Sequence, residues 1–151
     1  MHDATGPVEE RIQSERRHHK ILALVTADPR TAVVIRRARR MSDFLGAECF
    51  AVAVCRSGDL SDLPESDREA VERHLNFARN MRIETRILEG EDVAQAVVDF
   101  ARGNEVTQIL LARPIERFLV SLFSRGLPQR IVSLAKDMQI VIVSEREPAA
   151  E

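Results

Sequence analysis

VTQILLARPIERFLVSLFSRGLPQRI, residues 106–131, is the most informative stretch of the chain about its fold. Thr107–Ala112 is a continuous apolar run, which predicts a short strand covered on both faces. Pro114 ends that strand because proline has no N–H for a sheet ladder. A loop of mixed character reaches Gly126, and a helix is predicted to begin at Leu127–Pro128. Strand, loop and helix N-terminus in this order often hold an anion, since unpaired amides and the helix dipole point into the loop.

Length and composition are those of one soluble domain. The chain has 151 residues, of which 44% are hydrophobic and 30% charged. Its net charge of −2 creates no field that favours DNA or anionic lipid, and without Trp or Tyr it has few aromatic side chains for stacking bases. No apolar stretch approaches the ~20 residues of a membrane span, and the N-terminus has no apolar run typical of a signal peptide. We therefore expect a cytoplasmic protein with no nucleic-acid partner and no membrane insertion.

The two cysteines lie in one apolar run. If this run is a strand, Cys49 and Cys55 are about 20 Å apart at ~3.3 Å per residue. A disulfide requires Cα atoms within about 7 Å, so the two cannot bridge each other. We interpret both as buried, reduced thiols.

Strands and helices alternate along the rest of the chain. The further strands are predicted at Ile21–Val25, Cys49–Val54, Arg82–Leu88 and Ile140–Val143. Helices are predicted from Pro29 with Asp28 as N-cap, from Ser66 with a capping-box Glu69, over residues 90–103, and from Leu127 to about Lys136. This alternation predicts an α/β fold, an open parallel sheet with right-handed crossovers and helices on both faces. The domain is expected to span residues 20–144, between flexible tails at 1–19 and 145–151.

Two charged clusters have two interpretations each. Arg36, Arg37, Arg39 and Arg40 form either a solvated helix face or a grip for an acidic partner or a phosphate. The adjacent carboxylates Glu91-Asp92 suit the positive end of a helix dipole, or general acid–base chemistry or a metal. Since no third ligand is close in sequence, helix-terminus electrostatics explains this pair better.

A ligand site is expected where the order of the strands reverses, at the carboxyl ends of strands 21–25 and 107–112. The residues predicted to line it follow these strands, lie on a neighbouring strand, or begin the next helix: Thr26, Ala27, Asp28, Val52, Ala112, Arg113, Arg125, Gly126 and Leu127. No nucleophile–base pair and no Lys-[Ser/Thr] phosphate loop is recognisable, so no catalytic or metal residue is assigned.

Three stretches resemble the universal stress protein family, and more narrowly the version found in the cytoplasmic part of KdpD-type potassium sensor kinases. They are residues 33–41 (VVIRRARRM), 89–102 (EGEDVAQAVVDFAR) and 104–114 (NEVTQILLARP). The resemblance covers Lys20 to Ser144. It implies a five-stranded sheet in the order 3-2-1-4-5, a homodimer paired through strand 139–143, and a role in stress response or signalling.

ATP-binding members of this family share a loop with Gly, two residues, Gly, nine residues, Gly, then Ser or Thr. Ala112, Ile115, Arg125 and Gly126 occupy those positions here, and none of them matches. A β-branched residue resists the positive φ of such a glycine by about 1–2 kcal/mol. Thr26 also replaces the acidic residue that the family has after its first strand. The ATP motif is therefore degraded.

Other ligands stay open. Arg113, Arg117, Arg125 and Arg130 either supply charge in place of the lost motif or are surface charges of the loop. Some KdpD-like domains bind cyclic di-adenosine monophosphate, but the corresponding stretches here, 26–28 (TAD) and 49–53 (CFAVA), match poorly. An adenine nucleotide or a cyclic dinucleotide is the class of ligand that the resemblance implies, with its identity unknown.

Two functions follow as hypotheses. The first is a non-enzymatic regulatory domain that senses a nucleotide or another anion and acts on a partner protein. The second is an interaction dimer with a vestigial site, which docks to a sensor kinase or transporter. An ATPase or nucleotidyl-transfer enzyme on a similar sheet is disfavoured, because the motifs of those reactions are missing and fold alone does not grant activity.

Overall fold

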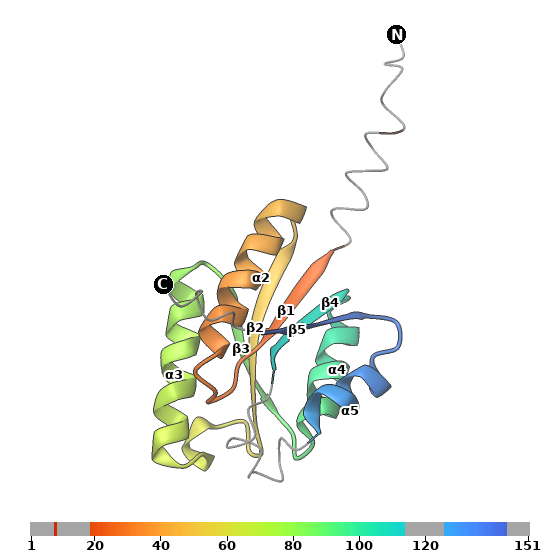
Figure 1. The fold of residues 1–151 in the computed structure, drawn as a ribbon. Coiled ribbons are helices and arrows are strands. Elements are labelled where there is room, and N and C mark those ends of the chain that lie inside the picture. The colour runs from red at the N-terminus through yellow and green to blue at the C-terminus, as the bar shows by residue number, and fades with distance from the viewer. Residues whose placement is uncertain (1–7, 9–18, 114–125, 145–151) are drawn as a thin grey trace, which may run out of the picture.

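The structure is a computed structural model that describes Val8 and residues 19–113 and 126–144 (Figure 1). The two predicted tails and the loop before Gly126 lie outside these ranges, apart from Val8 and His19. The elements, in chain order, are β1 (Lys20–Leu24), α2 (Thr31–Leu45), β2 (Glu48–Cys55), η1 (Leu60–Asp62), α3 (Glu65–Asn80), β3 (Glu84–Glu89), α4 (Val93–Gly103), β4 (Gln108–Ala112), α5 (Leu127–Leu134) and β5 (Gln139–Val143).

The five strands form one parallel sheet in the order β3-β2-β1-β4-β5. This confirms the expected α/β class and the strand order that the family resemblance implied. β1 is central, and its Leu22 lies beside Phe50 of β2 and Ile109 of β4. The chain leaves β1 toward β2 on one side and later returns to β4 on the other. The strand order therefore reverses between β1 and β4.

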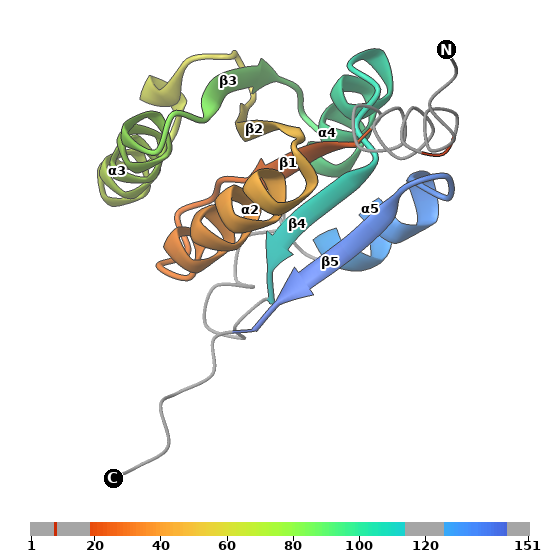
Figure 2. The same cartoon turned by 90° about the horizontal axis from the view of Figure 1, so that it is seen from above.

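Helices cover both faces of the sheet (Figures 1 and 2). Ile21 and Ala23 of β1 belong to the core cluster shared with α2 and α3, whereas Leu22 and Leu24 belong to the cluster shared with α4 and α5. Successive side chains of a strand point to opposite faces, so a central strand covered twice must be apolar throughout. That requirement explains the unbroken apolar runs of β1, β2 and β4. β3 is an edge strand, and its side chains are exposed or half-buried.

The predicted start of α2 is wrong, and so is the capping box predicted for α3. α2 begins at Thr31, and its N-cap residue is Arg30. The Asp28 carboxylate instead closes the turn that precedes the helix, where its Oδ1 accepts the Arg30 amide at 2.8 Å. α3 begins at Glu65, next to the predicted Ser66, but its N-cap residue is Pro64, with φ −52° and ψ 149°. Ser66 therefore lies inside the helix, and no side chain caps this end.

α4 begins at Val93, later than the predicted start at residue 90. Two helix ends have well-defined caps. Asp92 is the N-cap of α4, and its side chain accepts the Gln95 amide at 3.3 Å. This favours helix-terminus electrostatics as the role of the Glu91-Asp92 pair. Gly46 ends α2 in the left-handed region at φ 63°, and its amide donates to Ser42.

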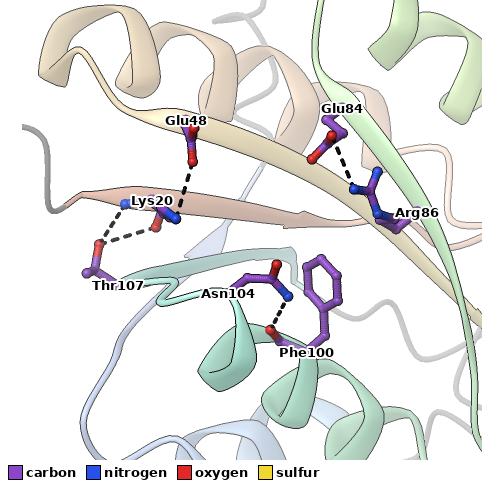
Figure 3. A network of polar contacts seen from close by, with 7 residues as sticks. All are labelled: Lys20, Glu48, Glu84, Arg86, Phe100, Asn104 and Thr107. Atoms are coloured by element: carbon purple, nitrogen blue, oxygen red, sulfur yellow. Dashed lines mark hydrogen bonds and ion pairs between the residues drawn. The ribbon is translucent and has the colours of Figure 1, made fainter.

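The amino-terminal edge of the sheet is tied together by polar contacts (Figure 3). Lys20 donates its amide to Thr107 Oγ1 at 3.2 Å, and this hydroxyl donates to the Lys20 carbonyl at the same distance. Lys20 Nζ lies 3.4 Å from a carboxylate oxygen of Glu48. These contacts hold β1, β2 and the start of β4 in register.

Both cysteines are buried and free, as predicted. Burial raises the pKa of the Cys49 thiol to about 11, so the group is protonated at neutral pH and a poor nucleophile. Within the described residues, no helix has the length and apolarity to cross a membrane.

Candidate functional site at the carboxyl edge of the sheet

The turn after β1 begins at the predicted site. Val25 donates its amide to the Val52 carbonyl at 2.8 Å, which extends the β1–β2 pairing by one residue. The Val52 side chain is fully buried in the core under α4 and α5, so Val52 positions the turn. Thr26, Ala27 and Asp28 are each half-buried.

A hydroxyl pair organises this turn. Thr26 Oγ1 lies 3.2 Å from Thr31 Oγ1 and accepts the Asp28 amide at 3.2 Å. The Thr31 hydroxyl lies 3.3 Å from the Thr26 carbonyl, to which it donates. Thr26 stands where the family has an acidic residue, and here its hydroxyl closes the turn on itself.

A buried histidine braces the same turn from α3. His74 is 7% exposed, and its Nδ1 lies 3.1 Å from the Thr26 carbonyl. Because a carbonyl oxygen only accepts, Nδ1 carries the proton and Nε2 is the free acceptor of the neutral ring. Burial lowers the pKa of His74, which favours this neutral form.

The other half of the site lies at the end of β4 and the start of α5. Ala112 is half-buried and Arg113 exposed, and the Arg113 amide donates to Val143 of β5 at 3.0 Å. Gly126 is the N-cap of α5 at φ 67°, a conformation that favours glycine. Leu127 packs into the cluster that contains Leu24 and Leu111, which brings the start of α5 to the carboxyl ends of β1 and β4.

The four arginines predicted around this loop differ in their partners and in whether the structure describes them. Arg130 forms a two-point ion pair with Asp92, at 2.5 Å and 2.6 Å, and so ties α5 to the start of α4. The hydrogen bonds from Arg130 lower the pKa of Asp92. Arg130 is therefore already paired and is a structural cation. Arg113 makes no ion pair with the described residues, whereas Arg117 and Arg125 lie outside them.

The structure brings together the turn at residues 26–28, Arg113, and the amides of Gly126 and Leu127. All of them leave the sheet at one edge, since β1 and β4 are adjacent and parallel. Sequence reasoning missed Thr31 and His74. His74 falls at helical spacing between Val71 and Ala78 on the buried face of α3, and this spacing is the signal that could have found it.

Metal chemistry has no support in the described ranges, where no group of three His, Cys, Asp or Glu side chains could hold an ion. Two hollows lie at the opposite, amino-terminal edge of the sheet. One, of about 350 Å³, is lined by Arg39, Cys49, Arg82 and their neighbours. The other, of about 540 Å³, lies beside α2.

Comparison with known proteins gives no matching family model. The chain is 30% identical over 144 residues to sensor protein KdpD of Escherichia coli, a match that covers 95% of this chain and 16% of KdpD. The chain thus spans about one sixth of the length of this relative.

Solved structures of universal stress proteins share the fold. One in complex with cAMP aligns with a TM-score of 0.59 at 14% identity, covering 83% of this chain and 95% of that one. One from Archaeoglobus fulgidus in complex with dAMP aligns with a TM-score of 0.56 at 16% identity, covering 82% and 95%. The chain has the universal stress protein fold.

Proposed function

We propose that this chain, which has the universal stress protein fold and a sequence related to a segment of KdpD, is a non-enzymatic cytoplasmic regulatory domain. It binds an adenine nucleotide, a cyclic dinucleotide or another anion at the carboxyl ends of β1 and β4, and it acts on a partner protein. The observation that carries this proposal is the convergence of three groups at one edge: the turn at residues 26–28, Arg113 and the start of α5.

The chemistry of this edge favours a small anion with a single phosphate or phosphodiester over a triphosphate. Gly126 and Leu127 offer amides at the positive end of the α5 dipole, Pro128 offers none, and the exposed Arg113 adds one positive charge. The Thr26 hydroxyl is already used within its turn. Two universal stress proteins of the same fold hold cAMP and dAMP, which each carry one phosphate.

Arg113→Ala tests the proposed site. We expect this change to weaken binding of AMP, cAMP or cyclic di-adenosine monophosphate at least tenfold, a loss of about 1.4 kcal/mol, because it removes an exposed cation at the end of β4 that makes no ion pair with the described residues. Isothermal titration calorimetry measures the change. Lys136→Ala, which removes an exposed cation between α5 and β5 at the opposite edge of the sheet, is the matched control. Unchanged binding by Arg113→Ala, or an equal loss in both variants, contradicts the site.

A second candidate function is an interaction dimer with a vestigial site, which docks to a sensor kinase or transporter. It is favoured by the closed hydrogen bonding of Thr26 and by the exposed edge of β5, where Ile142 is 46% exposed. Failure of every nucleotide in the calorimetric series, together with a stable dimer, would select this second function.

A further inference from the structure

A groove beside α2 lies at the edge of the sheet opposite the proposed nucleotide site. It has a volume of about 540 Å³ and is lined by Arg37, Arg40, Met41 and Phe44 of α2 and by the first residues of β4 and β5, Gln108 and Gln139. Gln108 and Ala112 are the two ends of β4, so the two sites are separated by about 13 Å of strand at ~3.3 Å per residue.

The arginine cluster of α2 divides into two pairs with different surroundings. The Arg36 guanidinium lies over the Phe77 ring at 5.9 Å, and Arg39 pairs with Asp43 at 2.6 Å. Arg37 and Arg40 are exposed, line the groove, and make no hydrogen bond or ion pair with any residue in the described ranges. Among the described residues that line the groove there is no carboxylate. Within this part of the chain, the groove therefore has two positive charges one helical turn apart without a counter-charge.

An aromatic side chain stands next to these charges. Phe44 is 85% exposed, although α2 buries its opposite face against the sheet. Phe44 follows Arg40 by four residues, so both side chains lie on the same face of the helix. Met41 and Leu45 are half-buried and extend the apolar wall. This arrangement suits an occupant that carries apolar surface beside its negative charges.

The third feature is an unsatisfied amide. Gln108 is only 7% exposed, and its Oε1 has no hydrogen-bond partner within the described residues. A buried polar atom without a partner costs about 1–3 kcal/mol. A half-turn of the terminal amide exchanges Oε1 and Nε2 without changing its shape, so either atom can meet an occupant of the groove. Gln108 thus offers a hydrogen-bonding group in the groove, beside the basic and apolar side chains of α2.

We propose that this groove docks an acidic, amphipathic segment of a partner protein. Two carboxylates of the segment pair with Arg37 and Arg40, an apolar side chain covers Phe44 and Met41, and a polar group reaches Gln108. A polypeptide fits better than a small molecule, because ligand pockets enclose most of a small ligand whereas Phe44 stands in the open. Nucleic acid and membranes are disfavoured, since the chain has a net charge of −2 and the groove only two unpaired cations. The inference rests on the proposed function only in taking the partner to be a protein.

The test is selection of a displayed library of random 12-residue peptides on the full chain. We expect the selected peptides to carry two or more Asp or Glu residues and an apolar residue. Fluorescence anisotropy then compares these peptides on Arg37→Glu/Arg40→Glu and on Arg73→Glu/Lys136→Glu, which makes the same change in charge at exposed positions elsewhere. The first variant should weaken binding at least tenfold, and the control less than threefold.

Two further variants separate docking from folding. Phe44→Ser should weaken the peptides at least fivefold while leaving Tm unchanged, because the ring is exposed. Gln108→Leu should keep or raise Tm, since it removes an unsatisfied buried amide, and should still weaken the peptides. Arg37→Glu/Arg40→Glu should leave nucleotide binding at the other edge unchanged. The two proposals can therefore fail separately. If the wild-type protein binds the peptides but no nucleotide, the proposed function is contradicted and the groove is not.

Three results of the peptide experiments overturn the proposal. They are the absence of selected binders, selected peptides that lack acidic residues, and equal binding to the two charge-reversal variants. Binding of phosphatidylserine vesicles or of a 12-nucleotide RNA through Arg37 and Arg40, in place of the peptides, also overturns it.

Discussion

A buried histidine links the turn after β1 to helix α3. His74 reaches the Thr26 carbonyl at 3.1 Å across 48 residues of sequence, and its ring is nearly enclosed. Protonation would place a charge in this enclosed position, which is why burial lowers the pKa of the imidazole. The charged groups nearest in effect are Arg73, which also lowers this pKa, and Asp28, which raises it. We therefore expect the turn that starts the candidate site to be sensitive to pH.

Acidification should destabilise the protein through this residue. A group whose pKa is lower in the folded state than in the unfolded chain stabilises the fold fully above the unfolded value, ~6.5 for His, and the contribution is lost as pH falls toward the folded value. We expect Tm to decline between pH 7.5 and pH 5.5. His74→Asn keeps a donor near Nδ1 but does not titrate, so its Tm should be lower than wild type at pH 7.5 and less dependent on pH. Thermal unfolding followed by circular dichroism measures both Tm values. If Tm depended on pH equally in the wild type and in His74→Asn, this role of His74 would be rejected.

Residue-scale contacts of this kind show what the sequence could not provide. His74 and Thr26, and likewise Arg130 and Asp92, are 48 and 38 residues apart, and each pair meets only after the sheet has formed. The pattern of the chain placed Arg130 near the expected site, but nothing in the pattern showed that Asp92 would pair with it. Local signals did predict features that depend on the backbone alone, such as the start of α5 at Leu127–Pro128.

At the scale of elements, β5 is the more apolar of the two edge strands, since β3 carries three charged side chains. β5 lies at the edge of the sheet, has no Pro or Lys, and leaves Ile142 46% exposed. Such an edge invites another strand, and a second copy of the chain is the simplest partner. The homodimer through residues 139–143 thus remains a prediction, with a physical reason in this strand.

Ile142→Lys tests the dimer with little risk to the monomer, since the side chain is already half exposed. We expect the wild type to be a dimer in size-exclusion chromatography with light scattering, and the variant to be a monomer, because a charge in the seam must be desolvated on pairing. Val132→Lys, at a position 50% exposed on α5, introduces the same side chain away from β5 and should remain dimeric. A dimeric Ile142→Lys would place the interface elsewhere.

The loop between β4 and α5 should not support tight ATP binding. The four positions of the family motif are Ala112, Ile115, Arg125 and Gly126 here, and they lack the glycines and hydroxyl that receive phosphates. We expect an ATP dissociation constant above about 1 mM, less than about 4 kcal/mol of binding free energy. Calorimetry measures it directly. The chain has neither Trp nor Tyr, so ATP retained during purification would dominate the absorbance at 260 nm, and micromolar binding or retained ATP would contradict this prediction.

The sequence predicted the types of the elements better than their boundaries. All five strands and four helices were predicted, because a sheet covered on both faces imposes apolar strands and amphipathic helices. The start of α2 and the N-cap residues of α2 and α3 were not predicted, since Arg30 and Pro64 make no side-chain cap and the local turn sets the first helical residue. The strand order was implied by the family resemblance, because hydrophobic periodicity predicts strands but not their order in the sheet.

For the whole molecule, the sheet separates two candidate surfaces. Its carboxyl edge carries the turn at residues 26–28 and Arg113, and its amino edge carries the groove at Arg37 and Phe44. Both surfaces are built on the same two layers of helices, so a substitution in one core cluster acts on both, whereas an exposed substitution acts on one. The exposed variants proposed for each edge can therefore report on that edge alone.

The predicted domain boundaries can be tested by comparing two fragments with the full chain. Both core clusters are built from residues between Ile21 and Val143, and the polar contacts at the amino edge begin at Lys20. A fragment of residues 19–144 should therefore unfold in one cooperative transition with a Tm within about 4 °C of the full chain, a difference of about 1 kcal/mol for a domain of this size. A fragment of residues 28–144, which lacks the central strand β1, should not fold, because β2 and β4 lose their shared neighbour. Calorimetric unfolding compares the three proteins. A drop of more than about 10 °C in the longer fragment would mean that the terminal segments belong to the folding unit and that the domain is larger than residues 20–144.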